Sequence, residues 1–437
     1  MVIRYLICFV ALLVVCSPVH AEPGSGIRIP TKNFSIVFAP ADSSIAVTID
    51  LSLVNPDSDS SAALLFSPRA EISGMRWLVG AETLAANYRR LPPETLAVTI
   101  PGQELGEPEL TLQVTYRYPV QVADSGLILL DRGHRWYPLI ADNIALCNLK
   151  IEVPKDWFAV TGGDLVSADT TGELVRSVWQ SRIPMFKVML GIGRTTQYVE
   201  FTQKSEQTNL HLLCQPGDSG SARGILQEAA KAFGYFSREI GPYAHSRLTL
   251  LETRMFPGAN LGTSIIALGA DMIAPIDRGG DAMLDLAVAS QWFGAGVFGR
   301  FQDEGFWFIT LSLPHYERLL YLRDTQGEEA FLKDLNRGLD RYRQFAGTAG
   351  DIPILQVDYL NTQEKGNVVA FKGPYLLEHV RRMIGPEAWE QFIMRLYETW
   401  QGEILTCQEF LGELVLVDPM AGSWLTSALS ETGLPQE

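Results

Sequence analysis

The chain has 437 residues, of which 47% are hydrophobic and 19% charged, the composition of a globular protein with room for two or three domains. Its formal net charge of −15 disfavours nucleic acid and anionic lipid as partners. No low-complexity tract or internal repeat points to a fibrous or disordered class.

The N-terminus has the pattern of an export signal. Arg4 precedes an apolar run over residues 5–15, and Val19-His20-Ala21 satisfies the small-residue rule for cleavage. The sequence therefore predicts a signal peptide over 1–21 and a secreted or periplasmic mature chain, with lipidation at Cys16 as the less favoured alternative. No later segment is long and apolar enough to predict a transmembrane helix.

From about residue 27 to 201, apolar and polar residues alternate as they do in half-buried strands. The clearest examples are 44–54 and 110–116, and turn sequences rich in Pro, Gly, Asp and Ser separate the strands. A longer segment, 135–166, has the pattern of a strand, a Val-Pro-x-x-Trp turn and a hairpin. We expect an antiparallel β-sandwich or saddle domain over residues 22–203.

Helical spacing dominates after a predicted linker at 203–208 and a further strand at 209–214. Its signals are capping residues ahead of apolar residues that recur every three or four positions, with Gly or Pro beyond the last of them. They predict helices over 219–240, 328–345 and 368–384, one beginning at Pro386, and one that a Thr406–Glu409 capping box begins. We expect a mainly helical domain over 204–437.

The central stretch of the chain is 281–309, which we interpret as two short helices joined by a tight connection. In the first helix, Leu286 and Ser290 lie one turn apart on the same face, and Ala287 lies beside Leu286. Two short motifs follow, Gln291-Trp292-Phe293-Gly294 and Asp303-Glu304-Gly305-Phe306.

These motifs resemble the metal site of the aminopeptidase N-like gluzincins. Their helix reads H-E-L-A-H-Q-W-F-G, in which two histidines bind zinc and a glutamate activates water, and the glutamate of a following N-E-G-F is the third ligand. The resemblance implies that Leu286 and Ser290 stand at the histidine positions, Ala287 at the catalytic base and Glu304 at the third ligand. Thirteen residues separate Ser290 from Glu304, against eighteen in the family's pattern.

Two further segments extend the resemblance over most of the mature chain. Gly258-Ala259-Asn260-Leu261-Gly262 is similar to the exopeptidase motif G-A-M-E-N, an edge strand that binds the substrate backbone, and Leu261 replaces the glutamate that holds the substrate's amino group. Residues 368–389 resemble the V-Y-x-K-G-A helix, with Ala370 in place of the tyrosine that stabilises the oxyanion. The resemblance implies a thermolysin-like domain with a degenerate site, whose vestigial cleft would be lined by Gly258, Ala259, Asn260, Gln291, Trp292 and Glu304.

The sequence offers no obvious replacement for the zinc ligands. No two mature-chain histidines are close enough in sequence to form a local ligand pair: His134, His211, His245, His315 and His379. Glu304 is better explained as an acid at a helix start. The three remaining cysteines, which we expect to be buried thiols although one disulfide stays open, are Cys147, Cys214 and Cys407. We therefore expect no zinc and no other cofactor.

We interpret the chain as an extracytoplasmic pseudopeptidase that binds a peptide or protein partner, and the replaced catalytic residues argue against an enzyme. One alternative is an active zinc aminopeptidase with ligands from unmatched positions. A second is a purely structural subunit of an envelope assembly. Ser290 as a nucleophile is disfavoured because the sequence shows no general base near it.

Overall fold

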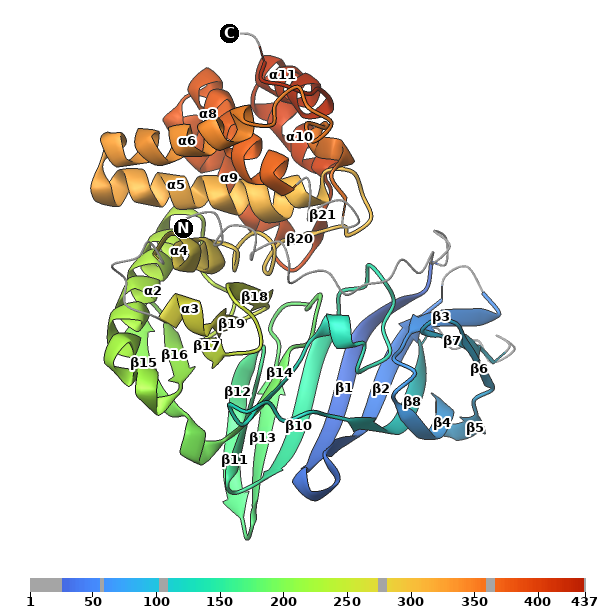
Figure 1. Cartoon of the computed structure of the whole chain (residues 1–437). Coiled ribbons are helices and arrows are strands. Elements are labelled where there is room, and N and C mark those ends of the chain that lie inside the picture. Colours follow the sequence, from blue (N-terminus) through green and yellow to red (C-terminus); the bar gives the residue numbers. More distant parts are fainter. Residues whose placement is uncertain (1–25, 56–58, 102–108, 274–280, 359–365, 436–437) are drawn as a thin grey trace.

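The computed structural model describes residues 26–55, 59–101, 109–273, 281–358 and 366–435. A β-rich half and a mostly helical half follow one another, with the helices stacked at one end of the molecule (Figure 1). The predicted signal peptide lies outside the described residues. Among the residues that are described, no helix is both long and apolar enough to cross a membrane.

The body of the N-terminal half is a twisted eight-stranded sheet in which buried and exposed residues alternate along the central strands. Its neighbouring strands are antiparallel, except for one parallel pair between Thr31–Val37 and Leu146–Glu152. In sheet order the strands are β12 (Asp164–Thr171), β13 (Leu174–Gln180), β10 (Leu146–Pro154), β1 (Arg28–Ala39), β2 (Ser44–Val54), β8 (Glu109–Pro119), β4 (Glu71–Val79) and β5 (Glu82–Ala85).

Two three-stranded sheets pack with the large sheet around one apolar core, which contains the fully buried Trp77, Trp136, Trp157 and Trp179. Their strands are β11 (Trp157–Thr161), β14 (Leu190–Arg194) and β9 (Leu127–Leu130) in one sheet, and β3 (Ser61–Leu65), β7 (Thr95–Thr99) and β6 (Tyr88–Leu91) in the other. The expected β-rich N-terminal domain is confirmed, and the predicted strand at 44–54 matches β2 residue for residue.

A third sheet opens the C-terminal half, and it corrects the predicted linker at 203–208. Residues 203–205 belong to one strand and Thr208 begins the next, with Ser205 paired to Thr208 across a tight turn. The expected domain boundary at 203/204 therefore falls inside a hairpin. The sheet order is β15 (Val199–Ser205), β16 (Thr208–Cys214), β17 (Arg247–Thr253), β19 (Ile265–Gly269) and β18 (Ala259–Gly262).

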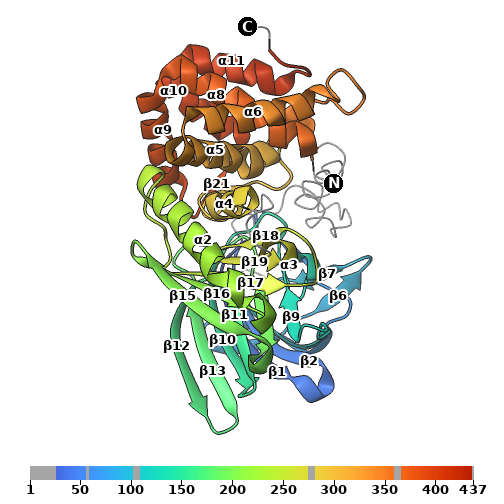
Figure 2. The same ribbon diagram turned by 60° about the vertical axis from the view of Figure 1, so that its left-hand side comes forward.

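Helices cover this sheet and build the rest of the C-terminal half; the longest of them lies across the sheet (Figure 2). They are α2 (Ser219–Glu239), α3 (Ala270–Ile273), α4 (Asp281–Ala289), α5 (Leu313–Gln326), α6 (Glu328–Arg343), α8 (Gly373–Ile384), α9 (Pro386–Trp400), α10 (Cys407–Val417) and α11 (Pro419–Ser430). Short elements complete the described chain: β20 (Phe298–Gly299), β21 (Ile404–Leu405) and the 3₁₀ turns η1 (Pro40–Asp42), η3 (Arg132–His134), η4 (Thr195–Gln197), η5 (Pro216–Asp218) and η8 (Ile354–Gln356).

The helix signals are largely confirmed. The Thr406 side chain accepts from Glu409 N at 3.1 Å, and the Glu409 carboxylate accepts from Thr406 N at 2.8 Å, so the predicted capping box begins α10. The second of the two short helices expected in 281–309 is instead the start of a longer one, because the chain runs on into α5.

Two segments have π-helical geometry that the sequence pattern did not predict, η7 (Phe308–Ser312) before α5 and η9 (Val368–Lys372) before α8. A proline, Pro314 or Pro374, follows each. A proline ring inside a helix clashes with the carbonyl four residues earlier, and a widened turn removes that clash. The two segments contact each other, and Ser312 Oγ donates to Val369 O at 2.8 Å.

Candidate functional site

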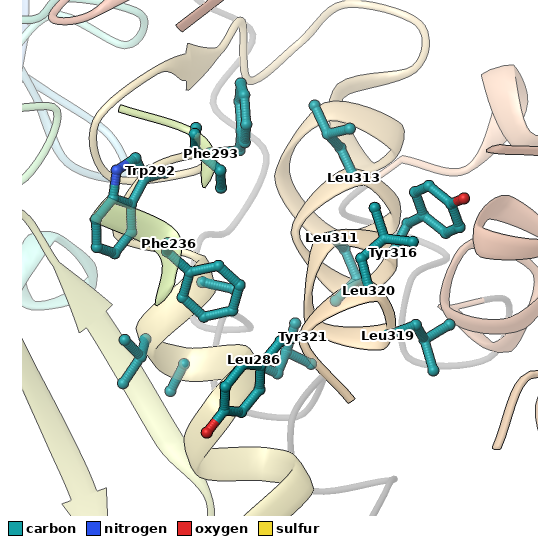
Figure 3. Packing of buried hydrophobic residues seen from close by; sticks show 14 of the residues in the cluster. Phe236, Leu286, Trp292, Phe293, Leu311, Leu313, Tyr316, Leu319, Leu320 and Tyr321 are labelled. Carbon is teal, nitrogen blue, oxygen red and sulfur yellow. The ribbon is translucent and has the colours of Figure 1, made fainter. Parts of the chain in front are cut away.

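Of the residues at the aligned zinc and base positions, Leu286 and Ala287 lie on α4 and Ser290 directly follows it, and all three are buried. Leu286 is 6% exposed, Ala287 0% and Ser290 1%. The Ser290 hydroxyl donates to Leu286 O at 2.8 Å, so it completes its own helix rather than facing a base. Figure 3 shows Leu286 in the same apolar cluster as Phe236 of α2 and Tyr321 of α5.

Gln291, the residue after this helical turn, ties α4 to the five-stranded sheet. Its amide oxygen accepts from Tyr243 Oη at 2.9 Å and from Ser264 N at 3.0 Å, and its amide nitrogen donates to Gly262 O at 3.1 Å. The side chain is 1% exposed. Ser264 adopts φ 56°, a conformation that non-glycine residues rarely occupy, and these bonds help to hold it there. Gln291 therefore has a structural role, because its hydrogen bonds connect the end of α4 to the five-stranded sheet.

Trp292 is a core residue. Its ring nitrogen donates to Gly241 O at 2.8 Å, and its ring lies 5.2 Å from that of Phe233 and 5.7 Å from that of Phe236. It is fully buried, and Figure 3 shows it beside Phe293 and Phe236. A side chain enclosed on all sides in this way cannot line an open cleft.

The segment similar to the exopeptidase motif does form an edge strand, because β18 pairs only with β19 among the described strands. Gly258, at φ 78°, leads into it, and its N–H donates to Asp271 at 3.0 Å. Ala259 and Asn260 are buried, and Leu261 packs against the large apolar cluster. This strand therefore presents no carboxylate to an incoming amine.

Asn260 joins this edge strand to the N-terminal half. Its amide nitrogen donates to Asp131 at 2.7 Å, and its amide oxygen accepts from Lys187 Nζ at 2.9 Å. Burial opposes ionisation of Asp131, but the hydrogen bond from His134 and the nearby Lys187 ammonium outweigh it and hold the pKa of that carboxyl below its usual range. Burial also lowers the pKa of Lys187 to about 8, although Asp131 opposes the shift.

Glu304 lies in an exposed turn. The neighbouring Gly305, at φ 77°, is closely packed on Cys407 at the start of α10. Gly294 packs closely against both Ser290 and Thr310. A Cβ placed on Gly294 would lie 3.4 Å from Ser290 O and 3.5 Å from Thr310 O. Glu304 is thus exposed, whereas Leu286 and Ser290 are buried.

Ala370, at the aligned oxyanion position, lies in η9 and is 8% exposed. Its methyl group has no proton to donate, and its backbone oxygen is a hydrogen-bond partner of His315. Lys372, two residues later, donates to Glu431 O at the end of α11. These groups support the helical bundle, and none of them is a donor for a developing oxyanion.

A zinc ion does not fit this donor set. Catalytic zinc takes three protein ligands from His, Cys, Asp or Glu and keeps one open position. Two of the aligned positions carry a buried leucine and a serine whose hydroxyl is already bonded, and Glu304 lies in an exposed turn. Across the described ranges, no group of three or more such donors is arranged to hold a metal.

The mature-chain histidines and cysteines occupy separate parts of the fold. His134 bonds to Asp131, His211 to Glu200, and His379 stacks on Trp424 with ring centroids 4.1 Å apart. His245 is completely buried. The three cysteines are buried free thiols, as expected, in Cys147, Cys214 and Cys407.

Sequence reasoning missed the residues that surround the edge strand. Asp131 and Lys187 meet Asn260 across 129 and 73 residues of chain, and no local pattern marks either of them. No local sequence pattern identifies Tyr243 or Ser264 either. The glycine-rich 258–262 segment was the one available signal, and it identified only the strand itself.

No protein-family profile matches the chain, and no curated protein matches it. Solved structures do resemble it. A two-domain M1 zinc metallopeptidase, in a glutamate-to-alanine variant bound to L-arginine, has a TM-score of 0.76 at 16% sequence identity, covering 94% of this chain and 96% of that chain. An M1 zinc metallopeptidase from Deinococcus radiodurans has the same score and identity, with 94% and 95% covered.

A third structure is a glutamate-to-alanine variant of an M1 zinc metallopeptidase from Deinococcus radiodurans bound to a Tyr-Ser-Ala substrate, also with a TM-score of 0.76 and 16% identity, covering 94% and 96% of the two chains. At this level of identity the likeness establishes the fold. The chain has the two-domain, aminopeptidase-like fold of M1 metallopeptidases, which confirms the expected α+β class.

Proposed function

We propose that the protein is an extracytoplasmic pseudopeptidase, which acts by binding a peptide or protein partner and not by hydrolysis. The observation that supports this most is the set of buried side chains on α4 and at the residue that follows it. Leu286, Ala287 and Ser290 are enclosed by the core. The Ser290 hydroxyl donates a hydrogen bond to Leu286 O in the preceding helical turn. Neither a metal-activated water nor a general base has a place in such a set.

A partner would be bound most readily at β18. An edge strand has one side free to pair with an extended segment, and strand addition of this kind needs no catalytic group. An M1 structure of the same fold holds a Tyr-Ser-Ala substrate, which supports peptide binding by the present chain. The proposal that the protein is exported rests on the sequence pattern of residues 1–21.

A structural subunit is the second candidate function, and one observation favours it. Asn260, Gln291 and Trp292 are all buried, and the polar atoms of each form hydrogen bonds with other parts of the same chain. Such a site would serve to hold the two halves of the protein together. A permanent assembly partner would then bind elsewhere on the surface.

The experiment is co-purification of the mature protein from its own extracytoplasmic fraction after mild crosslinking. It would compare the wild type with Leu261→Lys on β18 and with Thr170→Lys on the exposed hairpin strand β12. We expect a partner that the wild type and Thr170→Lys retain and that a folded Leu261→Lys protein loses. Retention by all three would support the structural subunit, and no partner at all would contradict both candidates.

A further inference from the structure

Basic side chains gather around the segment 186–188, next to the edge strand β18. The Arg132 guanidinium carbon lies 3.9 Å from the centroid of the Phe186 ring, and Arg132 Nη1 donates to Phe186 O at 3.1 Å. The adjacent Lys187 reaches Asn260 of β18, as described above. Arg132 and Lys187 are both partly exposed.

A third basic group, Lys32, is linked to this segment through Tyr137. Val188 N donates to Tyr137 Oη at 3.1 Å, and Lys32 Nζ lies 5.4 Å from the centroid of the Tyr137 ring. Lys32 is 1% exposed and stands on β1 opposite Cys147 of β10. Within the described part of the chain, Lys32 Nζ has a ring face beside it and no hydrogen bond or ion pair.

Lys32 has no carboxylate among the groups that shift its pKa, and the one beside Lys187 is Asp131, which is too far away to form an ion pair. Burial, reinforced by Arg132, lowers the pKa of each lysine to about 8, so both remain mostly charged at neutral pH. Burial raises the pKa of the Cys147 thiol to about 11, so this neighbour of Lys32 stays neutral. Asp131 is held by Gly133 N, His134 and Asn260, and Lys187 forms no ion pair in the described residues.

We propose that Lys32, Arg132 and Lys187 form a binding site for a carboxylate group of an extended peptide segment that lies along β18. The inference deepens the proposed function, since the carboxylate belongs to its partner. Ammonium and guanidinium donors form short, charge-assisted hydrogen bonds with a carboxylate. A doubly charged phosphate is disfavoured because the Asp131 carboxylate lies beside Lys187.

The test is calorimetric titration of the mature protein with four probes at neutral pH and low salt. The probes are acetyl-Ala-Glu-Ala-amide, acetyl-Ala-Gln-Ala-amide, acetyl-Ala-Ala-Ala with a free terminal carboxylate, and acetate. We expect at least one carboxylate peptide to bind about tenfold more tightly than the glutamine peptide, the difference that one charge-assisted hydrogen bond supplies. Preference for the glutamate peptide identifies a side-chain carboxylate, and preference for the free terminus identifies a terminal one.

Variants test the assignment to these residues. Lys187→Met and Arg132→Gln should each abolish the preference, Lys187→Arg should retain it, and Lys155→Met, which removes an exposed lysine paired with Glu173, should leave it unchanged. Near-ultraviolet circular dichroism checks that each variant is folded. If neither carboxylate peptide binds more tightly than the glutamine peptide, the inference is overturned, and it is also overturned if acetate binds as tightly as the peptides.

The two proposals can fail separately. If the wild type retains its cellular partner and folded Lys187→Met retains it equally well, the carboxylate site is refuted while the binding function stands. If the wild type retains no partner but shows the expected peptide preference, the binding function is refuted as framed and the carboxylate site is supported.

Discussion

Ser290 Oγ donates a hydrogen bond of 2.8 Å to the carbonyl oxygen of Leu286, so the two residues aligned with the zinc-binding histidines are bonded to each other. This bond occupies the hydroxyl proton and turns the oxygen toward the preceding helical turn. An i to i−4 bond of this type is a common way to satisfy a serine inside a helix. It leaves neither Leu286 nor Ser290 available as a metal ligand or a nucleophile.

The first prediction concerns metal. Purified mature protein should contain well under one zinc per chain, and Ser290→His should not raise that content, because one imidazole supplies only one of the three ligands that catalytic zinc requires. The larger ring in a site that is 1% exposed should also lower the free energy of unfolding by about 1–3 kcal/mol. Elemental analysis after dialysis and urea titration measure the two effects. Stoichiometric zinc that resists dialysis would refute the prediction.

The second prediction concerns catalysis. The mature protein should hydrolyse aminoacyl amides no faster than a buffer control, with or without added zinc, because the aligned base, ligand and oxyanion positions carry Ala287, Leu286, Ser290 and Ala370. Loss of one oxyanion donor alone typically reduces the rate on the order of 10²–10³-fold. Glu304→Ala is the matched control for a contaminating peptidase. Activity that a chelator abolishes and that disappears in Glu304→Ala would show that Glu304 is a ligand after all.

The third prediction concerns the link between α4 and the five-stranded sheet. Gln291→Leu keeps the side-chain volume but leaves Ser264 N, Gly262 O and Tyr243 Oη without their present partner. Each buried polar group left unsatisfied costs about 1–3 kcal/mol, so we expect a loss of several kcal/mol in the free energy of unfolding. Urea titration measures it, with the exposed Gln391→Ala as the control. A loss below 1 kcal/mol would mean that these bonds contribute little.

The fourth prediction concerns acid stability. Burial, together with Arg182, lowers the pKa of His245 to about 4, although Asp164 opposes the shift, so the folded protein keeps this imidazole neutral. The unfolded chain binds the proton near pH 6.5, and protein stability should therefore fall as the pH drops from about 6.5 to 4. His245→Phe should make this fall shallower, while His379→Phe should leave it unchanged. Urea titrations at a series of pH values compare the slopes, and identical slopes would contradict the assignment.

The fifth prediction concerns Glu317, a buried acid that should make the protein less stable as the pH rises, whereas His245 does so as the pH falls. Burial raises the pKa of Glu317 to about 8, although the Trp389 N–H and Arg381 oppose it, so folding requires this carboxyl to take up a proton at neutral pH. Its contribution to stability is full below about pH 4.5 and is lost as the pH rises through 8.

Glu317→Gln keeps the acceptor for Trp389 and removes the proton uptake. We therefore expect it to increase the free energy of unfolding at pH 8 by about 1–3 kcal/mol, since one pKa unit corresponds to about 1.4 kcal/mol. The effect should shrink at pH 4.5, and the exposed Glu398→Gln should show neither change. Thermal melts at both pH values measure it, and a destabilised Glu317→Gln protein at pH 8 would show that the carboxylate is ionised in the fold.

Much of the fold could be predicted from the sequence because burial imposes a period on each element. The strand at 44–54 has alternating residues on one buried face, and the capping box at Thr406 is a local exchange of two hydrogen bonds. The hairpin across 203–208 has the sequence pattern of a linker because its residues are polar. Its strand β15 is at the edge of a sheet, where every second side chain meets solvent.

The site could be predicted only where its residues are neighbours in sequence. The adjacency of Leu286 and Ser290 follows from helical geometry alone. The position of Glu304 does not, because a segment without a regular period links it to Ser290. The contacts of Asn260 with Asp131 and Lys187 depend on how the two halves of the chain pack, which no local pattern contains.

The paired π turns, η7 and η9, fix the rotational phase of the helices that follow them. A π turn holds one residue more than an α turn, so every side chain beyond it is rotated by about 100° from where an uninterrupted helix would place it. Loss of one residue from η7 would leave α5 intact but would rotate its core-facing side, with Tyr316 and Leu320, away from their present neighbours. The two helices are therefore in register with the rest of the core only as long as both extra residues are kept.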